Sequence, residues 1–180
     1  MLFRSVPGGR SGFTGQGTTG VAVKIGNSDS YEVVWGALGE GAATGLFNPT
    51  TLVLQSPWAN TNGNITFRNK LDLNGTTRTI DVDKEHTYHW DAAVNMDNRG
   101  YAQMLGTIGN SDAGNTAGLI KEGPGRLVLN AANTYDGGTT VNEGILHYMR
   151  ADAMPSTGSV TFNDGTELWV DLKGGDDFTP

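Results

Sequence analysis

Two histidines close together in the sequence are the first candidates for a metal site. His86 and His89 lie three positions apart, with Asp83, Glu85 and Asp91 close by in the sequence. Imidazole and carboxylate groups are common zinc ligands. On an extended strand, however, positions three apart face opposite sides, so this pair would converge only if the backbone turned between them. We therefore expect ordinary surface or turn histidines here, and no metal site.

His147 and Trp169 form the second candidate, a ligand-binding site. His147 directly follows Leu146, and Trp169 directly follows Leu168. If Leu146 and Leu168 stack in adjacent layers, both following residues point outward and lie side by side. An exposed aromatic face can pack against the apolar face of a sugar ring, and Trp58 is a further candidate of the same kind. The alternative is that a neighbouring loop or chain covers Trp169.

Acidic side chains are the third group. Asp81, Asp83 and Asp171 are expected to project from strands, and paired carboxylates can act as acid and base in glycoside hydrolysis. Outward carboxylates on repeated strands usually only increase solubility, and no cluster of acidic and basic residues on one face is evident from the sequence. Calcium-loop, phosphate-loop and nucleophile motifs are absent as well. We expect no catalysis and no cofactor.

Composition narrows the class of protein further. The chain has 180 residues, 27 glycines, no cysteine, a net charge of −7 and 17% charged residues. Lysine and arginine are not clustered, so nucleic acid is not an expected partner. No apolar run approaches the ~18 residues of a membrane helix. Glycine separates short apolar runs, which is the pattern of repeated tight turns.

The elements that would position these residues are short strands. We expect residues 1–20 to be a poorly ordered or edge segment, 36–48 to be a loop, and 84–115 to be the least regular part. Strand-like runs with alternating apolar residues or β-branched residues occupy 21–25, 31–35, 51–55, two pieces of 64–75, 78–83 and 102–108.

The most regular stretch is 118–146, where short apolar pieces alternate with Gly, Asn, Asp and Pro. Its ending is repeated once: Thr139–Gly144 corresponds to Val160–Gly165, and Leu146 then corresponds to Leu168. Val141 and Phe162 are 21 positions apart, whereas Leu146 and Leu168 are 22 apart, so we expect the extra residue to bulge near Thr166. A period near 20 fits one coil of a β-solenoid.

This stretch resembles the autotransporter-associated β-strand repeat of bacterial passenger regions. The matching features, in a fixed order, are GLIKEG, GRLVL, NTY before Gly137-Gly138, TTVN and GIL. The resemblance implies an all-β, right-handed parallel β-helix displayed outside the cell. It also implies a fragment of a longer chain that lacks the export signal and the anchor.

We therefore predict one β-helix segment over 21–180, with seven to nine coils of roughly twenty residues. Eight side chains are expected to point inward: Leu127, Leu129, Val141, Leu146, Val160, Phe162, Leu168 and Val170. The expected function is that of a non-catalytic stalk, extracellular or on the outer cell surface. A carbohydrate-binding adhesin is the second hypothesis and a polysaccharide-cleaving enzyme the third. Expected partners are the remaining coils of the same chain, with surface glycans or proteins of a host or neighbouring cell.

Overall fold

The computed structural model describes residues 9–14, 20–26, 28–36, 47–55, 64–83 and 101–172. Within these ranges the chain is built from strands, with one 3₁₀ turn, η2 (Ala151–Ala153), and no α-helix. The strands are two to five residues long, because turn-forming residues interrupt each apolar run.

The strands form three sheets in which neighbouring strands are parallel. Sheet A contains, in spatial order, β1 (Arg10–Phe13), β4 (Thr51–Leu54), β7 (Arg78–Val82), β10 (Leu119–Glu122), β12 (Thr139–Val141) and β14 (Val160–Phe162). Sheet B contains β2 (Val21–Val23), β5 (Ile65–Phe67), β8 (Tyr101–Met104), β11 (Arg126–Leu129), β13 (Ile145–Tyr148) and β15 (Glu167–Val170). Sheet C contains β3 (Glu32–Val34), β6 (Lys70–Asp72) and β9 (Ile108–Gly109).

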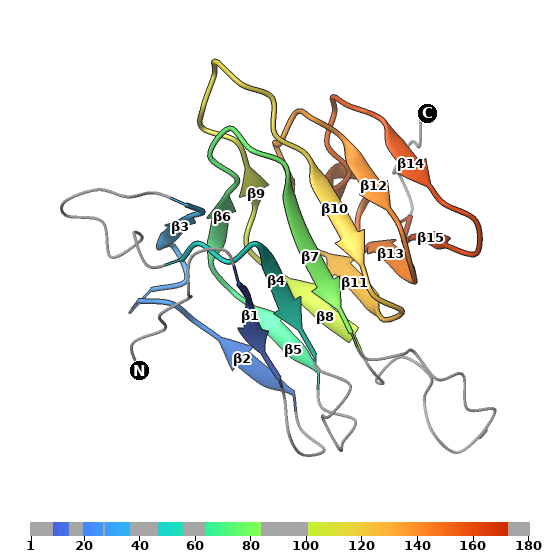
Figure 1. Cartoon of the computed structure of the whole chain (residues 1–180), viewed down its shortest axis with the longest axis horizontal. Helices are drawn as coiled ribbons and strands as arrows, with labels where there is room; N and C mark the ends of the chain where they lie inside the picture. Colours follow the sequence, from blue (N-terminus) through green and yellow to red (C-terminus); the bar gives the residue numbers. More distant parts are fainter. Residues whose placement is uncertain are drawn as a thin grey trace.

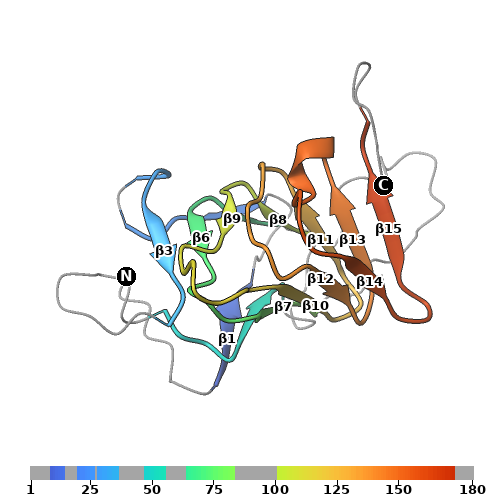
Figure 2. The same cartoon turned by 90° about the horizontal axis from the view of Figure 1, so that it is seen from above.

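The chain visits the sheets in turn, so successive circuits stack into a parallel β-helix (Figures 1 and 2). Its first coil, with β1 and β3, and its last coil, with β14 and β15, lie at opposite ends of the stack (Figure 2). Sheets A and B each have six strands, which gives six coils in the described part of the chain. At ~4.8 Å per coil, β1 lies about 24 Å from β14.

The described residues form six coils, fewer than the seven to nine expected, because the coils differ in length. In sheet A of the last coils, stacked residues are 20 or 21 positions apart, as for Asn142 with Glu122 and Asn163 with Asn142. Earlier coils are longer: Gly118 bonds to Thr77, 41 positions away in the sequence. The larger separation in the earlier coils accounts for the smaller number of coils in the described part of the chain.

The predicted register is confirmed. Val141 pairs with Phe162, and Leu146 pairs with Leu168. The extra residue is accommodated at Thr166, whose amide and hydroxyl both donate hydrogen bonds to the carbonyl of Asn163. This local turn absorbs the change in spacing before β15 begins.

Inward side chains fill the space between the sheets. In sheet B one row of inward residues runs through all six coils: Val21, Ile65, Ala102, Leu127, Leu146 and Leu168. Its four middle members are fully buried, whereas the end members are 36% and 37% exposed. Leu127, Leu129, Val141 and Leu146 are buried as predicted, at roughly 1.5–3 kcal/mol each.

The last coil is less buried than the middle coils because no described coil covers its outer side. Val160, Phe162, Leu168 and Val170 occupy the inward register, yet Phe162 is 38% exposed and Leu168 37%. At the other end, part of the predicted edge segment 1–20 forms strand β1, at the edge of sheet A. Both ends therefore present unpaired strand edges among the described residues.

Two asparagines organise the corners on the side of sheet C. Asn69 is fully buried; its side-chain oxygen accepts from the amide of Ile25, and its side-chain nitrogen donates to the carbonyls of Ile25 and Tyr31. A Cβ at Gly106 would lie 2.0 Å from the Asn69 carbonyl oxygen, so only glycine fits there. This corner divides the single strand predicted over 102–108 into β8 and β9.

Asn133 continues this side where the strands of sheet C end. Its side chain accepts from the amide of Ile108 and donates to the carbonyl of Ala153, so it connects η2 to β9 across the intervening coil. In the described ranges, no helix is long and apolar enough to cross a membrane.

Candidate functional site

His147 and Trp169 lie side by side on the outer face of sheet B, as the register predicts. Their ring centroids are 5.7 Å apart in an edge-to-face arrangement. His147 is only 7% exposed, and its Nε2 atom lies 3.1 Å from Asp171 Oδ1, although neither ring nitrogen makes a hydrogen bond. The pair would become an ion pair on protonation of the imidazole.

Arg126 occupies the space beside Trp169. Its guanidinium carbon lies 5.2 Å from the Trp169 ring centroid and 4.9 Å from that of Tyr101, so the cation sits between two aromatic rings. The indole nitrogen of Trp169 donates to Glu167. The Trp169 ring is therefore engaged by protein groups and only half-buried, which leaves a limited surface for a sugar ring.

The remaining candidates from the sequence lie elsewhere. Trp58, His86 and His89 fall outside the described residues. Among the residues that are described, no group of three or more His, Asp or Glu side chains is placed to hold a metal ion. Sugar binding by His147, Trp169 or Trp58 stays a prediction.

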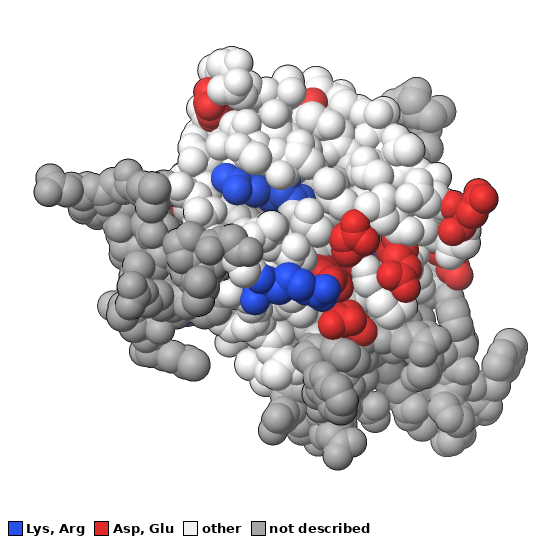
Figure 3. All heavy atoms as spheres, viewed as in Figure 1, with Lys and Arg blue, Asp and Glu red and all other residues white. Residues whose placement is uncertain are grey.

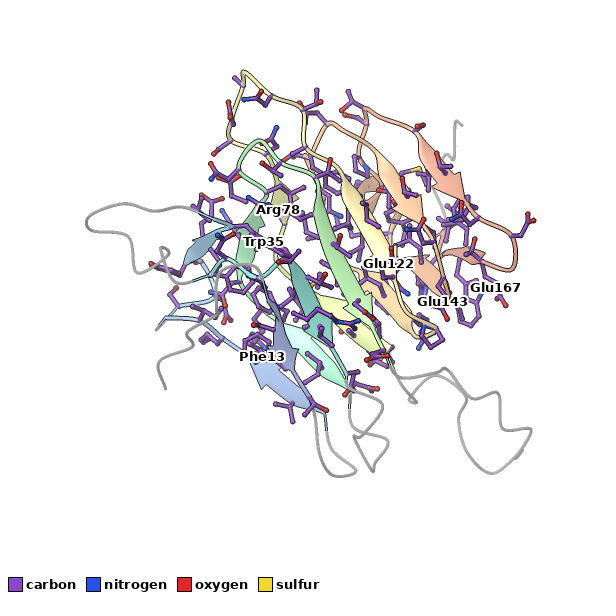
Figure 4. All side chains as sticks on the ribbon, viewed as in Figure 1. Phe13, Trp35, Arg78, Glu122, Glu143 and Glu167 are labelled. Carbon is purple, nitrogen blue, oxygen red and sulfur yellow. The ribbon has the colours of Figure 1, made fainter. Side chains whose placement is uncertain are left out.

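Sequence reasoning missed a cleft on the outer face of sheet A. It has a volume of about 530 Å³, and we call it the acidic cleft. Its lining comprises four carboxylates, one cation and smaller groups: Asp81, Asp83, Glu122, Glu143, Arg10, Thr51, Thr79, Gly123 and Pro124. Acidic side chains gather on this face next to basic ones (Figure 3), and Glu122 and Glu143 lie near each other at the ends of β10 and β12 (Figure 4).

Asp81 is the most buried carboxylate of the acidic cleft. Its side chain is 9% exposed, and its Oδ2 atom accepts from Arg10 at 2.5 Å. Burial raises the pKa of Asp81, which the nearby Arg10 charge partly offsets. Arg10 also lies 3.7 Å from Asp83, so one cation from the first coil faces two carboxylates at the end of β7.

A ladder of polar side chains extends from this cleft along sheet A. Asn163 donates to the side chain of Asn142 at 2.9 Å, and Asn142 donates to Glu122 at 2.6 Å. Glu122 in turn pairs with Asp81 in the strand register. Asparagines from successive coils therefore meet after β12 and β14.

Lys121 was also missed, although the alternation of β10 places it on the inward face with Leu119. The residue is fully buried, and its ammonium donates to the carbonyls of Glu122, Gly123 and Glu143 at 2.5–2.9 Å. Burial lowers the pKa of Lys121 from 10.5 to about 8, because desolvation outweighs the neighbouring carboxylates. The side chain joins the corner after β10 to the corner after β12.

Tyr135 is a second buried side chain that makes hydrogen bonds within these coils, on the side opposite Lys121. Its ring is fully buried, and its hydroxyl shares a 2.5 Å hydrogen bond with Thr139 Oγ1. Tyr148 donates to the same oxygen at 3.5 Å. Burial raises the pKa of both tyrosines, so both stay neutral in the core.

Lys121, Tyr135 and Tyr148 all lie in the segment from β10 to β13. The same segment matches a known family. Residues 119–147 match the family described as passenger-associated-transport-repeat. The resemblance inferred from the sequence at 118–146 is thereby confirmed. No curated protein and no solved structure matches the chain.

Within the repeat, the glycines make the corners that stacking requires. Gly123 and Gly144 have φ of +76° and +72°, and a Cβ on either would lie within 2.6 Å of a neighbouring oxygen atom. The repeat therefore contains the sheet A and sheet B strands of two successive coils, β10 with β11 and β12 with β13, whose corners are held by glycine and by Lys121.

Proposed function

We propose that this chain is a stalk segment of an autotransporter-type passenger, non-catalytic and displayed outside the cell. The observation that carries the proposal is the transport repeat lying inside a continuous stack of parallel coils. A passenger-associated role follows from the repeat, and the mechanical role is our inference from the stack.

Two features support a mechanical role. Ladders of backbone hydrogen bonds run along the axis in each sheet, as in Ile145 to Gly125 and Glu167 to Gly144. The inward rows are apolar and fully buried in the middle coils. Such a stack resists bending and protease attack, because cleavage requires local opening of a coil.

Display is tested by placing the chain between an epitope tag and an outer-membrane anchor. We expect the tag to be accessible to antibody on intact cells, and residues 101–172 to resist limited proteolysis. Leu146→Asp, which places a charge in the buried row, should lose the resistance, whereas Asp164→Asn on the exposed turn should keep it. Rapid cleavage within 101–172 of the unaltered chain would contradict a stalk.

The two other hypotheses make different predictions. An adhesin would give saturable binding on a glycan array that Trp169→Ala abolishes. An enzyme would release reducing ends or unsaturated products from polysaccharides, and Asp83→Asn would abolish the release. The stalk proposal expects neither signal.

A further inference from the structure

An aspartate or asparagine followed by glycine can react with its own backbone. Among the described residues, such pairs occur as Asn74-Gly75, Asp136-Gly137 and Asp164-Gly165. The backbone nitrogen of the glycine can attack the side-chain carbonyl carbon Cγ of the preceding residue, because glycine has no Cβ to hinder the approach. In a folded chain, hydrogen bonds that fix these two groups prevent the attack, so the contacts of each pair decide whether it reacts.

No described contact restrains the pair Asp164-Gly165. Both residues are exposed, in the turn between β14 and β15 at the end of the stack (Figures 1 and 2). Among the described residues, the Asp164 carboxylate and the Gly165 amide make no hydrogen bond or ion pair. The turn is instead closed by Thr166, whose amide and hydroxyl donate to the carbonyl of Asn163. A Cβ at Gly165 would meet nothing within 4 Å, so the space around the reacting groups is open.

The pair Asp136-Gly137 is also exposed, but it is restrained. Its carboxylate Oδ1 accepts from the amide of Ala117 and from the side chain of Asn110, both at 3.0 Å. The Gly137 amide donates to the carbonyl of Ala117 at 2.9 Å, so both reacting groups are held. The bonds from Ala117 and Asn110 also lower the pKa of Asp136, which leaves less of the neutral carboxyl that can lose water.

The pair Asn74-Gly75 is restrained in the same way. The Gly75 amide donates to Asn110 Oδ1 at 2.8 Å, and the Asn74 side-chain nitrogen donates to the carbonyl of Trp35 at 3.2 Å. Asn110 therefore contacts two of the three pairs and holds one reacting group in each. Of the described pairs, this leaves Asp164-Gly165 as the one whose reacting groups can meet.

We propose that Asp164 converts spontaneously to isoaspartate, a modification that needs no enzyme and no reactant except water. The Gly165 nitrogen forms a bond to Cγ of the neutral carboxyl and gives up its proton, the carboxyl hydroxyl leaves as water, and a cyclic succinimide results. Water then opens this ring. Attack at Cγ restores aspartate, whereas attack at the main-chain carbonyl carbon gives isoaspartate. One water is released and one is consumed, nothing is oxidised or reduced, and the mass of the chain is unchanged.

The product changes the turn that positions β15. In isoaspartate the main chain runs through Cβ and Cγ of residue 164, which adds one atom to the backbone between Asn163 and Gly165. Among the described strands, β15 pairs only with β13, and its inward Leu168 is 37% exposed. A longer turn should therefore loosen β15 from β13, while the middle strands of sheet B keep both neighbours. The proposal is independent of the stalk role.

The test is incubation of the full chain at physiological temperature and mildly acidic pH over several weeks. Labelling with an isoaspartyl-specific methyltransferase measures the product, and electron-transfer fragmentation of peptides assigns it to a residue. We expect roughly tenfold or more isoaspartate at residue 164 than at residue 136, because the bonds to Ala117 and Asn110 must open before Asp136 can react. In concentrated urea, where these bonds are absent, the two sites should react at similar rates. Comparable yields at the two sites in the folded chain, or the same ratio in urea, would overturn the proposal.

Two variants of Asp164 provide the chemical control. Asp164→Glu keeps the charge but would require a larger, less favourable ring, and it should form no such product. Asp164→Asn should form isoaspartate severalfold faster with release of ammonia, since an uncharged amide is attacked more readily than a carboxylate. An equal yield in Asp164→Asn and the unaltered chain, or none at residue 164 in either, would contradict the proposed chemistry.

Amide exchange measures the structural consequence. Exchange in β15 should be severalfold faster in the incubated chain than in the fresh chain, with exchange in β11 unchanged. Incubated Asp164→Glu should exchange like the fresh protein. Unchanged exchange in β15 of a chain that carries isoaspartate at residue 164 would overturn the inferred loosening.

Discussion

Lys121 is the residue on which the corners of the transport repeat depend most. A fully buried ammonium is unfavourable unless its donors are used, and here three carbonyls from two successive corners take all of them. One side chain thereby supplies hydrogen-bond donors to turn carbonyls of two coils at once. Alternation within β10 could have revealed its inward position, but lysine is rarely assigned to a core.

Replacement of Lys121 by alanine should lower the free energy of unfolding by about 3 kcal/mol. The methylene stem is lost from a fully buried site and three carbonyls lose their donor, which together outweigh the relief of a desolvated charge. Lys121→Met keeps the stem and should cost less. Lys24→Ala, at a side chain 42% exposed in an ion pair, should cost under about 1 kcal/mol. Urea denaturation measures all three, and equal effects at positions 121 and 24 would contradict this role.

Stability should also depend on pH through Lys121. Its pKa is lowered from 10.5 to about 8 in the folded chain, so between these values the unfolded chain binds more protons. Stability from this group therefore rises with pH across that window, by up to about 1.4 kcal/mol per unit. Lys121→Met should lack this slope. Identical pH profiles from pH 8 to 10 in both proteins would exclude the effect.

At the scale of elements, the turns decide whether a coil can stack. Gly144 and Gly165 occupy equivalent turns one coil apart, with φ of +72° and +81°. A Cβ at Gly144 would lie 2.6 Å from the carbonyl oxygens of Gly123 and Gly125, whereas at Gly165 it would meet nothing within 4 Å. Alanine variants at these two positions therefore separate the cost of backbone strain from the cost of a steric clash.

Gly165→Ala should therefore cost about 1–2 kcal/mol, which is the strain of a left-handed alanine. Gly144→Ala adds the clash and should cost about 3 kcal/mol or more. Thermal or urea unfolding gives both values. A larger loss at Gly165 than at Gly144 would mean that the corners do not stack as described.

Most strands could be predicted from the sequence because they depend on local alternation. The register of β12–β14 and β13–β15, with its bulge at Thr166, followed from internal repetition. The acidic cleft could not be predicted in this way, because Arg10 and Asp81 are 71 positions apart and meet only through the stacking of coils of unequal length. The same unequal coil lengths explain why the described residues form fewer coils than a uniform period predicts.

At the scale of the whole molecule, stability should decrease toward the last coil. Leu146 and Leu168 are neighbours in one inward row, but Leu146 is fully buried and Leu168 is 37% exposed. Leu146→Ala should cost about 3 kcal/mol and Leu168→Ala about 1 kcal/mol. Amide exchange should likewise be faster in β14 and β15 than in β10–β13. Equal costs for the two leucines would show that the last coil is covered.

The stacked coils are tested most directly by methyl–methyl nuclear Overhauser effects along the inward row of sheet B. With methyl labelling of Val21, Ile65, Ala102, Leu127, Leu146 and Leu168, the parallel β-helix predicts contacts only between successive members of this row. Leu127–Leu146 and Leu146–Leu168 contacts, with none between Leu127 and Leu168, are the decisive pattern. Absence of the Leu146–Leu168 contact, or contacts that skip a coil, would contradict the account.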